Sequence, residues 1–190
     1  MKELVILGGP NGAGKTTAAQ DLLPKTLGIR EFVNADEIAR GLSPFNPQAT
    51  AVAAGRLMIE RIRALAAAGE SFAFETTCAG RGHVGLVRQC RSAGYRVALV
   101  FLWLPSPQAA LDRVARRVRD GGHAIPDEIV LRRYGVGLRN MRHLYLPAVD
   151  EALIYDNADE GRIVIAELVR GSPLRVIDVE RWRLIEEATG

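Results

Sequence analysis

A glycine-rich stretch near the start of the chain has the residue types and spacing of a phosphate-binding loop. Residues 9–16 read Gly-Pro-Asn-Gly-Ala-Gly-Lys-Thr and fit the pattern G-x-x-x-x-G-K-[ST], the P-loop. Glycines let such a loop turn its backbone N–H groups toward an anion, and the N-terminus of the helix that follows adds partial positive charge. The stretch therefore predicts binding of a nucleoside triphosphate.

Individual residues of this loop have distinct expected roles. Lys15 supplies a mobile cation for the β- and γ-phosphates, and the hydroxyl of Thr16 is a ligand that Mg²⁺ accepts. We expect Lys15 to be exposed and to be essential for turnover, with ATP and Mg²⁺ as the cofactors. The predicted nucleotide-binding residues are Gly9, Pro10, Asn11, Gly12, Ala13, Gly14, Lys15, Thr16 and Thr17, with Thr16 as the metal ligand.

The elements around the loop indicate an α/β fold. An apolar segment, residues 4–7, precedes the loop and a helix-forming segment, residues 14–23, follows it, with Pro24 as its expected stop. Strand and helix patterns then alternate, which predicts a parallel sheet with helices on both faces. The predicted fold is a kinase-like P-loop NTPase, a single domain over residues 1–190, with a five-stranded parallel sheet and a C-terminal edge hairpin. The other expected strands are residues 31–34, 71–74, 96–104 and 152–156, with the hairpin at 163–169 and 174–177.

Two carboxylates follow predicted strands at the edge where ligands bind in such sheets. Asp36 is the candidate base or orienter for an acceptor hydroxyl; the alternative is that it caps a short helix. Glu75 is expected to hold Mg²⁺ through water or to bind the acceptor; the alternative is a solvated strand end. We expect Asp36, Glu75 and the P-loop to line the same opening at the carboxyl edge of the sheet. The predicted substrate-binding residues are Asp36, Glu75, Thr76, Thr77 and Arg81.

An arginine-rich pair of helices, at about residues 107–147, resembles a lid. Guanidinium groups match phosphate oxygens, so closing such a lid would bring positive charge onto the γ-phosphate. The arginines there are Arg113, Arg116, Arg117, Arg119, Arg132 and Arg133. Not all of them can face one site, and we select Arg119, Arg132 and Arg133, which join Lys15 and Asp36 as predicted catalytic residues. His123 is expected to be a turn residue between the helices.

Composition sets limits on the class of protein. The chain has 190 residues, 48% hydrophobic and 25% charged, with a net charge of +3, which is ordinary for one globular domain. No apolar run approaches the ~18 residues of a membrane helix, and because a strand is predicted within the first residues, we expect no signal peptide. Cys78 and Cys90 form no disulfide framework, so we expect a cytoplasmic protein. The three histidines lack the spacing of a zinc site.

Several segments together resemble the zeta-toxin-like P-loop kinases, and more narrowly the branch described as predicted ABC-type ATPase. Residues 8–17, 32–36 and 72–77 carry the resemblance, and residues 121–126, 132–134 and 155–157 fit the same branch. The resemblance implies an ATP/Mg²⁺ kinase that phosphorylates a hydroxyl of UDP-N-acetylglucosamine or a related sugar or nucleotide. It also implies an antitoxin protein as partner.

Positions carry over from this family residue by residue. Asp36 matches the acceptor-activating carboxylate, Glu75 and Thr77 the sugar-binding strand end, and the lid arginines the γ-phosphate clamp. This chain departs from the family on the acceptor side. The toxins usually carry a His-Pro pair shortly after the acceptor-activating Asp, whereas the loop of this chain reads Ser43-Pro44-Phe45. The toxins also have Glu-Gly-Thr at the end of the sugar-binding strand, where this chain has Glu75-Thr76-Thr77.

Other readings of a P-loop stay open. The chain lacks the guanine motif Asn-Lys-x-Asp, the transporter signature Leu-Ser-Gly-Gly-Gln and an apolar Walker B strand ending in Asp, which favours a small phosphotransferase. A regulatory ATPase with water as its acceptor is the first alternative. A kinase of nucleic-acid ends is the second, and it is disfavoured because we find no aromatic stacking platform outside expected core positions. We therefore expect an ATP-dependent kinase of small molecules, with no membrane or nucleic-acid partner.

Overall fold

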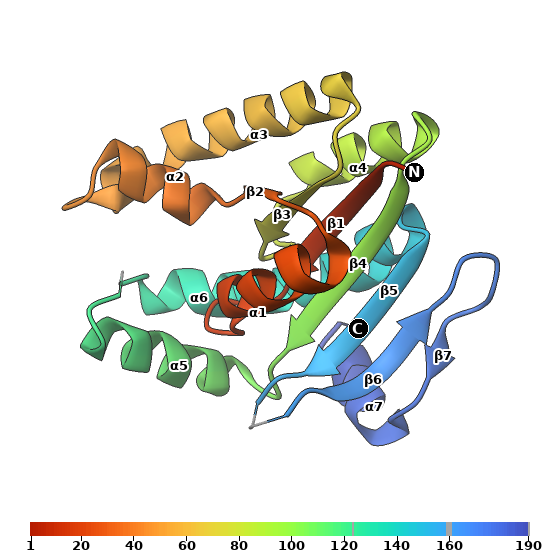
Figure 1. Cartoon of the computed structure of the whole chain (residues 1–190). Coiled ribbons are helices and arrows are strands. Elements are labelled where there is room, and N and C mark those ends of the chain that lie inside the picture. Colours follow the sequence, from red (N-terminus) through yellow and green to blue (C-terminus); the bar gives the residue numbers. More distant parts are fainter. Residues whose placement is uncertain (123, 159–160, 190) are drawn as a thin grey trace.

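A seven-stranded sheet forms the centre of the computed structural model, which describes residues 1–122, 124–158 and 161–189 (Figure 1). The strand order is β2-β3-β1-β4-β5-β6-β7, and the first five strands run parallel. The hairpin at the carboxyl end joins the sheet antiparallel to β5, so the sheet has seven strands rather than five. The strands are β1 (Glu3–Gly8), β2 (Glu31–Val33), β3 (Phe72–Thr76), β4 (Arg96–Trp103), β5 (Glu151–Asp156), β6 (Ile163–Leu168) and β7 (Arg175–Val176).

Helices lie on both sides of this sheet; in Figure 1, α1 crosses in front of it and α4 lies behind. The α-helices are α1 (Lys15–Leu22), α2 (Ala35–Leu42), α3 (Ala51–Ala68), α4 (Gly82–Ser92), α5 (Pro107–Arg119), α6 (Asp127–Asn140) and α7 (Val179–Glu187). Pro24 does not stop the first helical segment outright, because the chain continues as a π-helical turn over Leu23–Leu27. Within the described ranges no helix combines the length and apolar character needed to cross a membrane.

The core follows the hydrophobic patterns of the sequence. Strand β4 lies between β1 and β5, and its side chains alternate between buried and partly buried from Val97 to Val100 and are all buried at Phe101–Trp103. Helix α3 buries one apolar face, with Met58, Ile62 and Leu65 at helical spacing. The face of α6 is buried in the same way, at Val130, Tyr134 and Leu138. Burial of these side chains is the dominant stabilising contribution to the fold.

The strand order decides which loops meet. Since β1 lies between β3 and β4, the loops after these three strands leave the sheet side by side. Leu7, just before the P-loop, pairs with Glu75 on β3. In Figure 1 the arrowheads of β3, β4 and β5 point toward the side where α2, α5 and α6 gather. Ligands of open α/β sheets bind at this carboxyl edge.

Candidate active site

The P-loop is shaped by backbone conformations that only glycine adopts easily. Gly12 has φ +79°, and a Cβ there would lie 2.9 Å from Cβ of Arg113 on α5. At Gly9, with φ +144°, a Cβ would lie 2.4 Å from the carbonyl oxygen of Leu102. The loop therefore packs tightly against the end of β4 and against α5. A side chain at either glycine would deform it.

Lys15 lies inside the loop rather than in solvent. Only 6% of its surface is exposed, so the expectation of an exposed lysine is wrong. Its Nζ donates to the carbonyl oxygen of Pro10 at 2.9 Å and lies 3.6 Å from Oε1 of Glu75. The side chain folds back over the loop because these two acceptors replace the water that an ammonium group loses on burial. This places its charge at the centre of the loop.

Asn11 supplies a further polar atom at this point. It is 5% exposed, and among the described residues its Oδ1 is a buried oxygen without a hydrogen-bond partner. Such orphan groups are rare in folded proteins and require an explanation. Asn11 lines the same cavity as Lys15. A ligand that donates a hydrogen bond to Oδ1 of Asn11 would satisfy this buried oxygen.

Glu75 joins three segments of the chain. Its Oε2 accepts hydrogen bonds from the Thr16 hydroxyl at 2.8 Å and from Nδ2 of Asn34 at 2.9 Å, while its other oxygen faces Lys15. The alternative of a solvated strand end is therefore wrong. Of the two functional alternatives, this position favours the phosphate and metal side, because Glu75 contacts P-loop side chains directly.

Asp36 is not the cap of its helix. Helix α2 starts at Ala35 and its N-cap is Asn34, whose Oδ1 accepts from the backbone N–H groups of Asp36 at 2.8 Å and Glu37 at 3.4 Å. The capping alternative for Asp36 is thus wrong, since Asn34 already satisfies these donors. The carboxylate of Asp36 sits in the first turn of α2, exposed, and lines the cavity.

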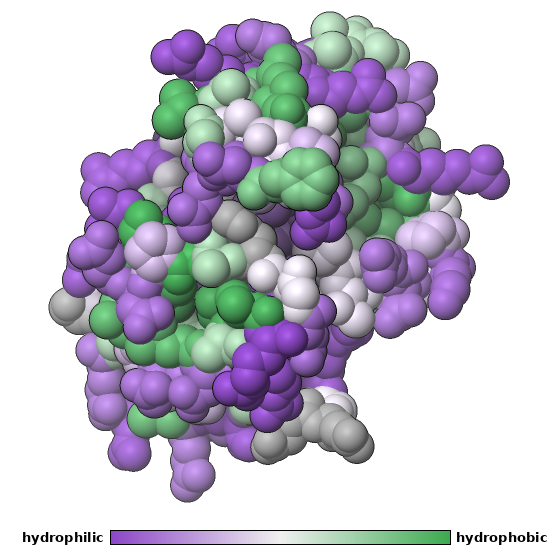
Figure 2. Space-filling view, turned by 90° about the vertical axis from the view of Figure 1, so that its left-hand side faces the viewer, coloured by the Kyte–Doolittle hydropathy of each residue, from purple (hydrophilic) through white to green (hydrophobic). Residues whose placement is uncertain are grey.

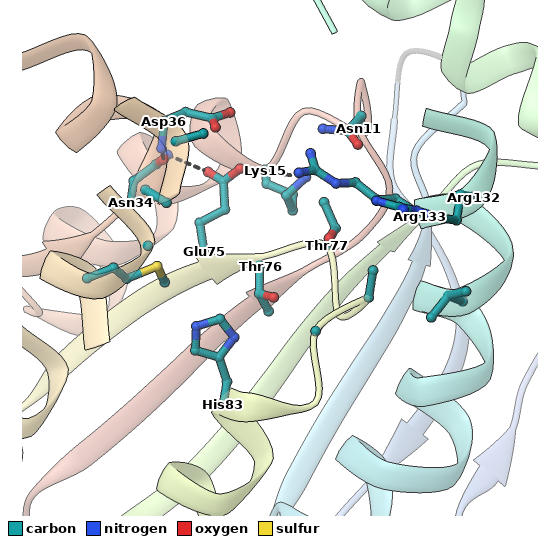
Figure 3. Close-up of a pocket in the computed structure, with 17 residues that line it drawn as sticks. Asn11, Lys15, Asn34, Asp36, Glu75, Thr76, Thr77, His83, Arg132 and Arg133 are labelled. Atoms are coloured by element: carbon teal, nitrogen blue, oxygen red, sulfur yellow. Dashed lines mark hydrogen bonds and ion pairs between the residues drawn. The ribbon is translucent and has the colours of Figure 1, made fainter. Parts of the chain in front are cut away.

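One cavity of about 490 Å³ brings these residues together (Figure 3). Asp36 enters it from α2, and Arg132 and Arg133 enter from α6 on the opposite side. Thr76, which is buried and accepts from the backbone N–H of Cys78 at 3.0 Å, lies on its floor. The lining residues are Asn11, Lys15, Asn34, Ala35, Asp36, Ala51, Gly55, Met58, Glu75, Thr76, Thr77, Ala79, Gly80, His83, Arg132, Arg133 and Val136.

Not every predicted site residue lies in this cavity. Arg119 is exposed at the end of α5, and Arg81 is exposed at the start of α4; neither is among the lining residues. His123 lies outside the described residues. The remaining predicted arginines surround the outer side of the P-loop: Arg113 donates to the carbonyl oxygen of Ala158, and Arg116 and Arg117 line a separate hollow beside Gly12.

The predicted lid helix α6 is fixed to the loop that follows β3. An added Cβ at Gly137 would lie 2.3 Å from the carbonyl oxygen of Thr77, so the two backbones touch. Nδ2 of Asn140 donates to the carbonyl oxygens of Cys78 at 2.9 Å and Ala79 at 3.0 Å. These contacts hold Arg132 and Arg133 relative to the floor of the cavity, so the helix acts as a wall.

A hydrogen bond joins the segment between α2 and α3 to the segment between α5 and α6. Nε2 of Gln48, between α2 and α3, donates at 2.7 Å to the carbonyl oxygen of Ala124, between α5 and α6. Figure 2 looks at this side of the molecule, where a hydrophilic rim surrounds a middle region of apolar and weakly polar side chains. The hydrogen bond ties the two pairs of helices together on this side.

Two residues near the ligand edge were missed in the sequence. Asn157, directly after β5, donates from Nδ2 to the carbonyl oxygen of Ala13 at 2.8 Å and so holds the P-loop; its place after a parallel strand is a usable signal. His83 lines the cavity, with its ring 5.3 Å from that of Phe74. Burial lowers the pKa of His83 below its ordinary value. No local pattern marks His83, because the fold alone brings it to the cavity.

The sequence of the chain matches the AAA domain family AAA_33 over residues 4–134, more than half of its length. The chain belongs to this family. The matched range begins in β1, includes the P-loop, Asp36 and Glu75, and ends in α6 just after Arg133. An uncharacterized protein of Haemophilus influenzae (strain ATCC 51907 / DSM 11121 / KW20 / Rd) is 29% identical over 129 residues, which are 66% of this chain and 88% of that protein.

Two solved structures share the fold. A chain of the AvrRxo1-ORF1:-ORF2 complex with ATP is 19% identical with a TM-score of 0.79, covering 100% of this chain and 64% of its own length. This chain thus spans less than two thirds of that relative. A chain from the PezAT chromosomal toxin-antitoxin system of the human pathogen Streptococcus pneumoniae is 15% identical with a TM-score of 0.64, covering 99% of this chain and 86% of its own. At such identities the likeness concerns the fold. The predicted zeta-toxin-like P-loop kinase resemblance is confirmed at that level.

Proposed function

We propose that this protein is an ATP-dependent kinase that phosphorylates a hydroxyl group of a small molecule. The supporting observation is the single cavity in which Lys15 and Glu75 meet Asp36 and the arginines of α6. Phosphoryl transfer requires positive charge at the transferring group and a carboxylate at the attacking hydroxyl. Both lie here on opposite sides of one space with room for an acceptor.

Each residue has a defined part in the reaction. Lys15 and the loop amides bind the β- and γ-phosphates of ATP, while Arg133 and Arg132 stabilise the charge on the transferring phosphoryl group. The acceptor oxygen forms a bond to the γ-phosphorus as the bond to the β,γ-bridging oxygen breaks. ADP leaves, and the proton of the acceptor hydroxyl passes to the carboxylate of Asp36.

The residues beside the phosphates suit Mg²⁺. The Thr16 hydroxyl and Oε2 of Glu75 are hard oxygen ligands 2.8 Å apart. Among the described residues there is no group of three or more His, Cys, Asp or Glu side chains placed to hold a metal ion. Mg²⁺ is held by one or two protein oxygens together with substrate phosphates and water, and Thr16 and Glu75 offer two such oxygens. The ion would neutralise phosphate charge, and Thr16 and Glu75 would hold it.

A second hollow fits the rest of the nucleotide. It has a volume of about 630 Å³ and lies beside the outer turn of the P-loop, lined by Gly14, Thr17, Arg113, Asn157, Gly161 and Arg162. Asn157 donates to the carbonyl oxygen of Ala13 in the P-loop, and Arg113 donates to the carbonyl oxygen of Ala158. We assign the base and ribose of ATP to this hollow. The complex of AvrRxo1-ORF1 with ORF2, which shares the fold, was solved with ATP.

UDP-N-acetylglucosamine is the first acceptor to test, on the strength of the family resemblance. The test is transfer of label from ATP·Mg²⁺ to this sugar nucleotide, beside a panel of sugars, nucleosides and short oligonucleotides. We expect label on a sugar-containing acceptor. Steady phosphate release with no labelled acceptor would support the regulatory ATPase instead, and label on oligonucleotide ends would support the nucleic-acid kinase.

A protein partner is a separate proposal. The two structures with the same fold come from a complex of two open reading frame products and from a toxin-antitoxin system. If this chain is likewise toxic, expressing it in a bacterial host should slow growth, and the Lys15→Ala variant should not. Equal growth with both proteins, at equal expression, would argue against toxicity and against an antitoxin.

A further inference from the structure

The turn at the end of β5, residues 156–158, contacts both the P-loop and α5. Nδ2 of Asn157 donates to the carbonyl oxygen of Ala13 in the P-loop at 2.8 Å. The carbonyl oxygen of Ala158 accepts a hydrogen bond from Arg113 on α5. Asn157 and Arg113 also line the hollow to which we assign the base and ribose of ATP. A shift of this turn would therefore displace part of that hollow together with its hydrogen bond to the P-loop.

Asp156 holds this turn with a buried carboxylate. The residue is 7% exposed. Its Oδ1 accepts a hydrogen bond from the backbone N–H of Ala158 at 2.9 Å, and its Oδ2 accepts one from Nε of Arg181 at 2.8 Å. A buried carboxylate that loses its cation is strongly unfavourable. Arg181 supplies a positive charge to Asp156, and it does so from α7, 25 residues further along the chain.

Arg181 is held in a defined orientation in the first turn of α7. Asp178 is the N-cap of this helix, and its Oδ1 accepts from the backbone N–H of Arg181 at 3.0 Å. Its Oδ2 accepts from Nη1 of the guanidinium group at 2.6 Å. A cation in the first turn of a helix opposes the helix macrodipole, which favours anions there. The helix itself therefore does not account for an arginine at this position, whereas the two carboxylates that it joins do.

Helix α7 belongs to a part of the chain that the family match does not include. The match ends at residue 134, and Asp156 and Arg181 both follow it. The helix lies against β6, with Trp182 and Ile185 buried (Figure 1). These apolar side chains attach α7 to the sheet. Arg181 adds a polar contact that reaches from the helix to the carboxyl end of β5.

We propose that Arg181 is a positioning residue for nucleotide binding: through Asp156 it holds the turn at the end of β5 against the P-loop and thereby raises the affinity for ATP. Arg181 lines neither the cavity nor the hollow beside the P-loop, so it acts through Asp156. Without Arg181, the charge of Asp156 loses its partner, and movement of this carboxylate toward water displaces Asn157 from Ala13. The inference rests on ATP binding, which is part of the function proposed above.

Calorimetric titration with a non-hydrolysable ATP analogue and Mg²⁺ tests this role, with transfer kinetics in parallel. Arg181→Met keeps a long side chain and removes the charge. We expect the Kd for the analogue to rise about 3–30-fold. The kcat at saturating ATP and the KM for the acceptor should stay within about twofold of wild type. A purely structural role would instead lower the Tm and the active fraction and leave the Kd of the folded protein unchanged.

Arg183→Met is the matched control on the same helix. Arg183 is exposed, and its ion pair with Glu187, at 3.5 Å, stays within α7. Such a surface pair contributes little to stability. We expect this variant to bind the analogue as wild type does. A Kd raised as much as in Arg181→Met would mean that loss of any positive charge on α7 weakens binding, which would overturn the positioning role.

Asp156→Asn breaks the same contact from the other side. Asparagine offers one acceptor oxygen where the carboxylate offers two, and it leaves no buried charge unpaired. We expect Asp156→Asn and the double variant Asp156→Asn/Arg181→Met to raise the Kd as much as Arg181→Met does, because all three break one link. Effects that multiply in the double variant would overturn the route through Asp156. If Arg181→Met does not fold, the other two variants decide, and a wild-type Kd in either would overturn the inference.

Failure of this inference and failure of the kinase function give different results. Nucleotide binding that none of these substitutions weakens overturns the positioning role and leaves the kinase intact. If wild type labels no acceptor, the kinase function fails, and the Kd values still test the positioning role. If wild type binds no nucleotide, hydrogen exchange tests it. The backbone amides of residues 9–17 should then exchange faster in the double variant than in wild type and Arg183→Met. Equal exchange would overturn the inference.

Discussion

The phosphate half and the acceptor half of the cavity are built in different ways. In the phosphate half, consecutive residues form one loop, and hydrogen bonds from Lys15 to Pro10 and from Thr16 to Glu75 hold it within itself and to β3. In the acceptor half, Asp36, Met58 and His83 come from three separate helices. Substitutions in the first half should therefore impair the use of ATP and Mg²⁺, whereas substitutions in the second should slow transfer to the acceptor and leave ATP binding intact.

The largest effect is expected at Lys15. Lys15→Ala removes the cation at the centre of the loop, and we expect transfer to fall about 10³-fold or more. The fold should persist, because Glu75 keeps its hydrogen bonds to Thr16 and Asn34. Steady-state transfer and thermal unfolding measure the two properties. Normal turnover by folded Lys15→Ala protein would exclude the P-loop mechanism.

The next effect tests the arginines of α6 against those of α5. Arg133→Ala should slow transfer about 10²-fold or more, because Arg133 lines the cavity and its charge stabilises the transferring group. Arg119→Ala is the matched control, since Arg119 is exposed and outside the cavity. Its rate should stay within about twofold of wild type, as for a surface substitution away from the site. Similar losses in both variants would mean that α5 moves onto the phosphates during the reaction.

A substitution at Glu75 tests whether this carboxylate contributes to Mg²⁺ binding or to acceptor binding. Glu75→Gln weakens the oxygen ligands beside Thr16, and we expect the Mg²⁺ concentration for half-maximal rate to rise about 10–100-fold. The KM for the acceptor should change little. A titration of rate against Mg²⁺ and against acceptor measures both. A raised acceptor KM with unchanged Mg²⁺ dependence would return Glu75 to the acceptor half.

The smallest effect concerns the contact between α6 and the loop after β3. Gly137→Ala places a Cβ against the carbonyl oxygen of Thr77, which should destabilise the protein by about 1–3 kcal/mol. Gly135→Ala, on the same helix with open space around it, should stabilise by up to about 1 kcal/mol. At this chain length each kcal/mol corresponds to about 2–4 °C in Tm. Equal Tm changes would show that α6 is not docked on the loop.

Features that depend on neighbouring residues were predictable from the sequence. The P-loop, the five parallel strands and the apolar faces of α3 and α6 follow from local spacing and periodicity. Because ligands of open α/β sheets bind at the carboxyl ends of the strands, the positions of Asp36 and Glu75 after two strands also predicted that they lie at one edge of the sheet. These predictions needed no knowledge of how distant segments pack.

Features that depend on three-dimensional packing were not predictable. The N-cap of α2 is Asn34 rather than Asp36. Both residue types are good N-caps, so the sequence alone does not show which of the two begins the helix. Lys15 is buried because Pro10 and Glu75, one near and one far in sequence, both accept its charge. His83 lines the cavity because the fold packs its ring against Phe74 of β3, whereas Arg119, exposed at the end of α5, does not line it.

The most direct test of the account is phosphate transfer by Asp36→Asn. Asparagine keeps the shape of the side chain but cannot take a proton at neutral pH, so transfer to the best acceptor should fall about 10²–10⁴-fold. ATP affinity and slow acceptor-free hydrolysis should be unchanged, because Lys15 and Glu75 are intact. Unaltered transfer by Asp36→Asn, measured with labelled ATP·Mg²⁺ and wild type in parallel, would contradict the assignment of Asp36 and with it the proposed division of the cavity.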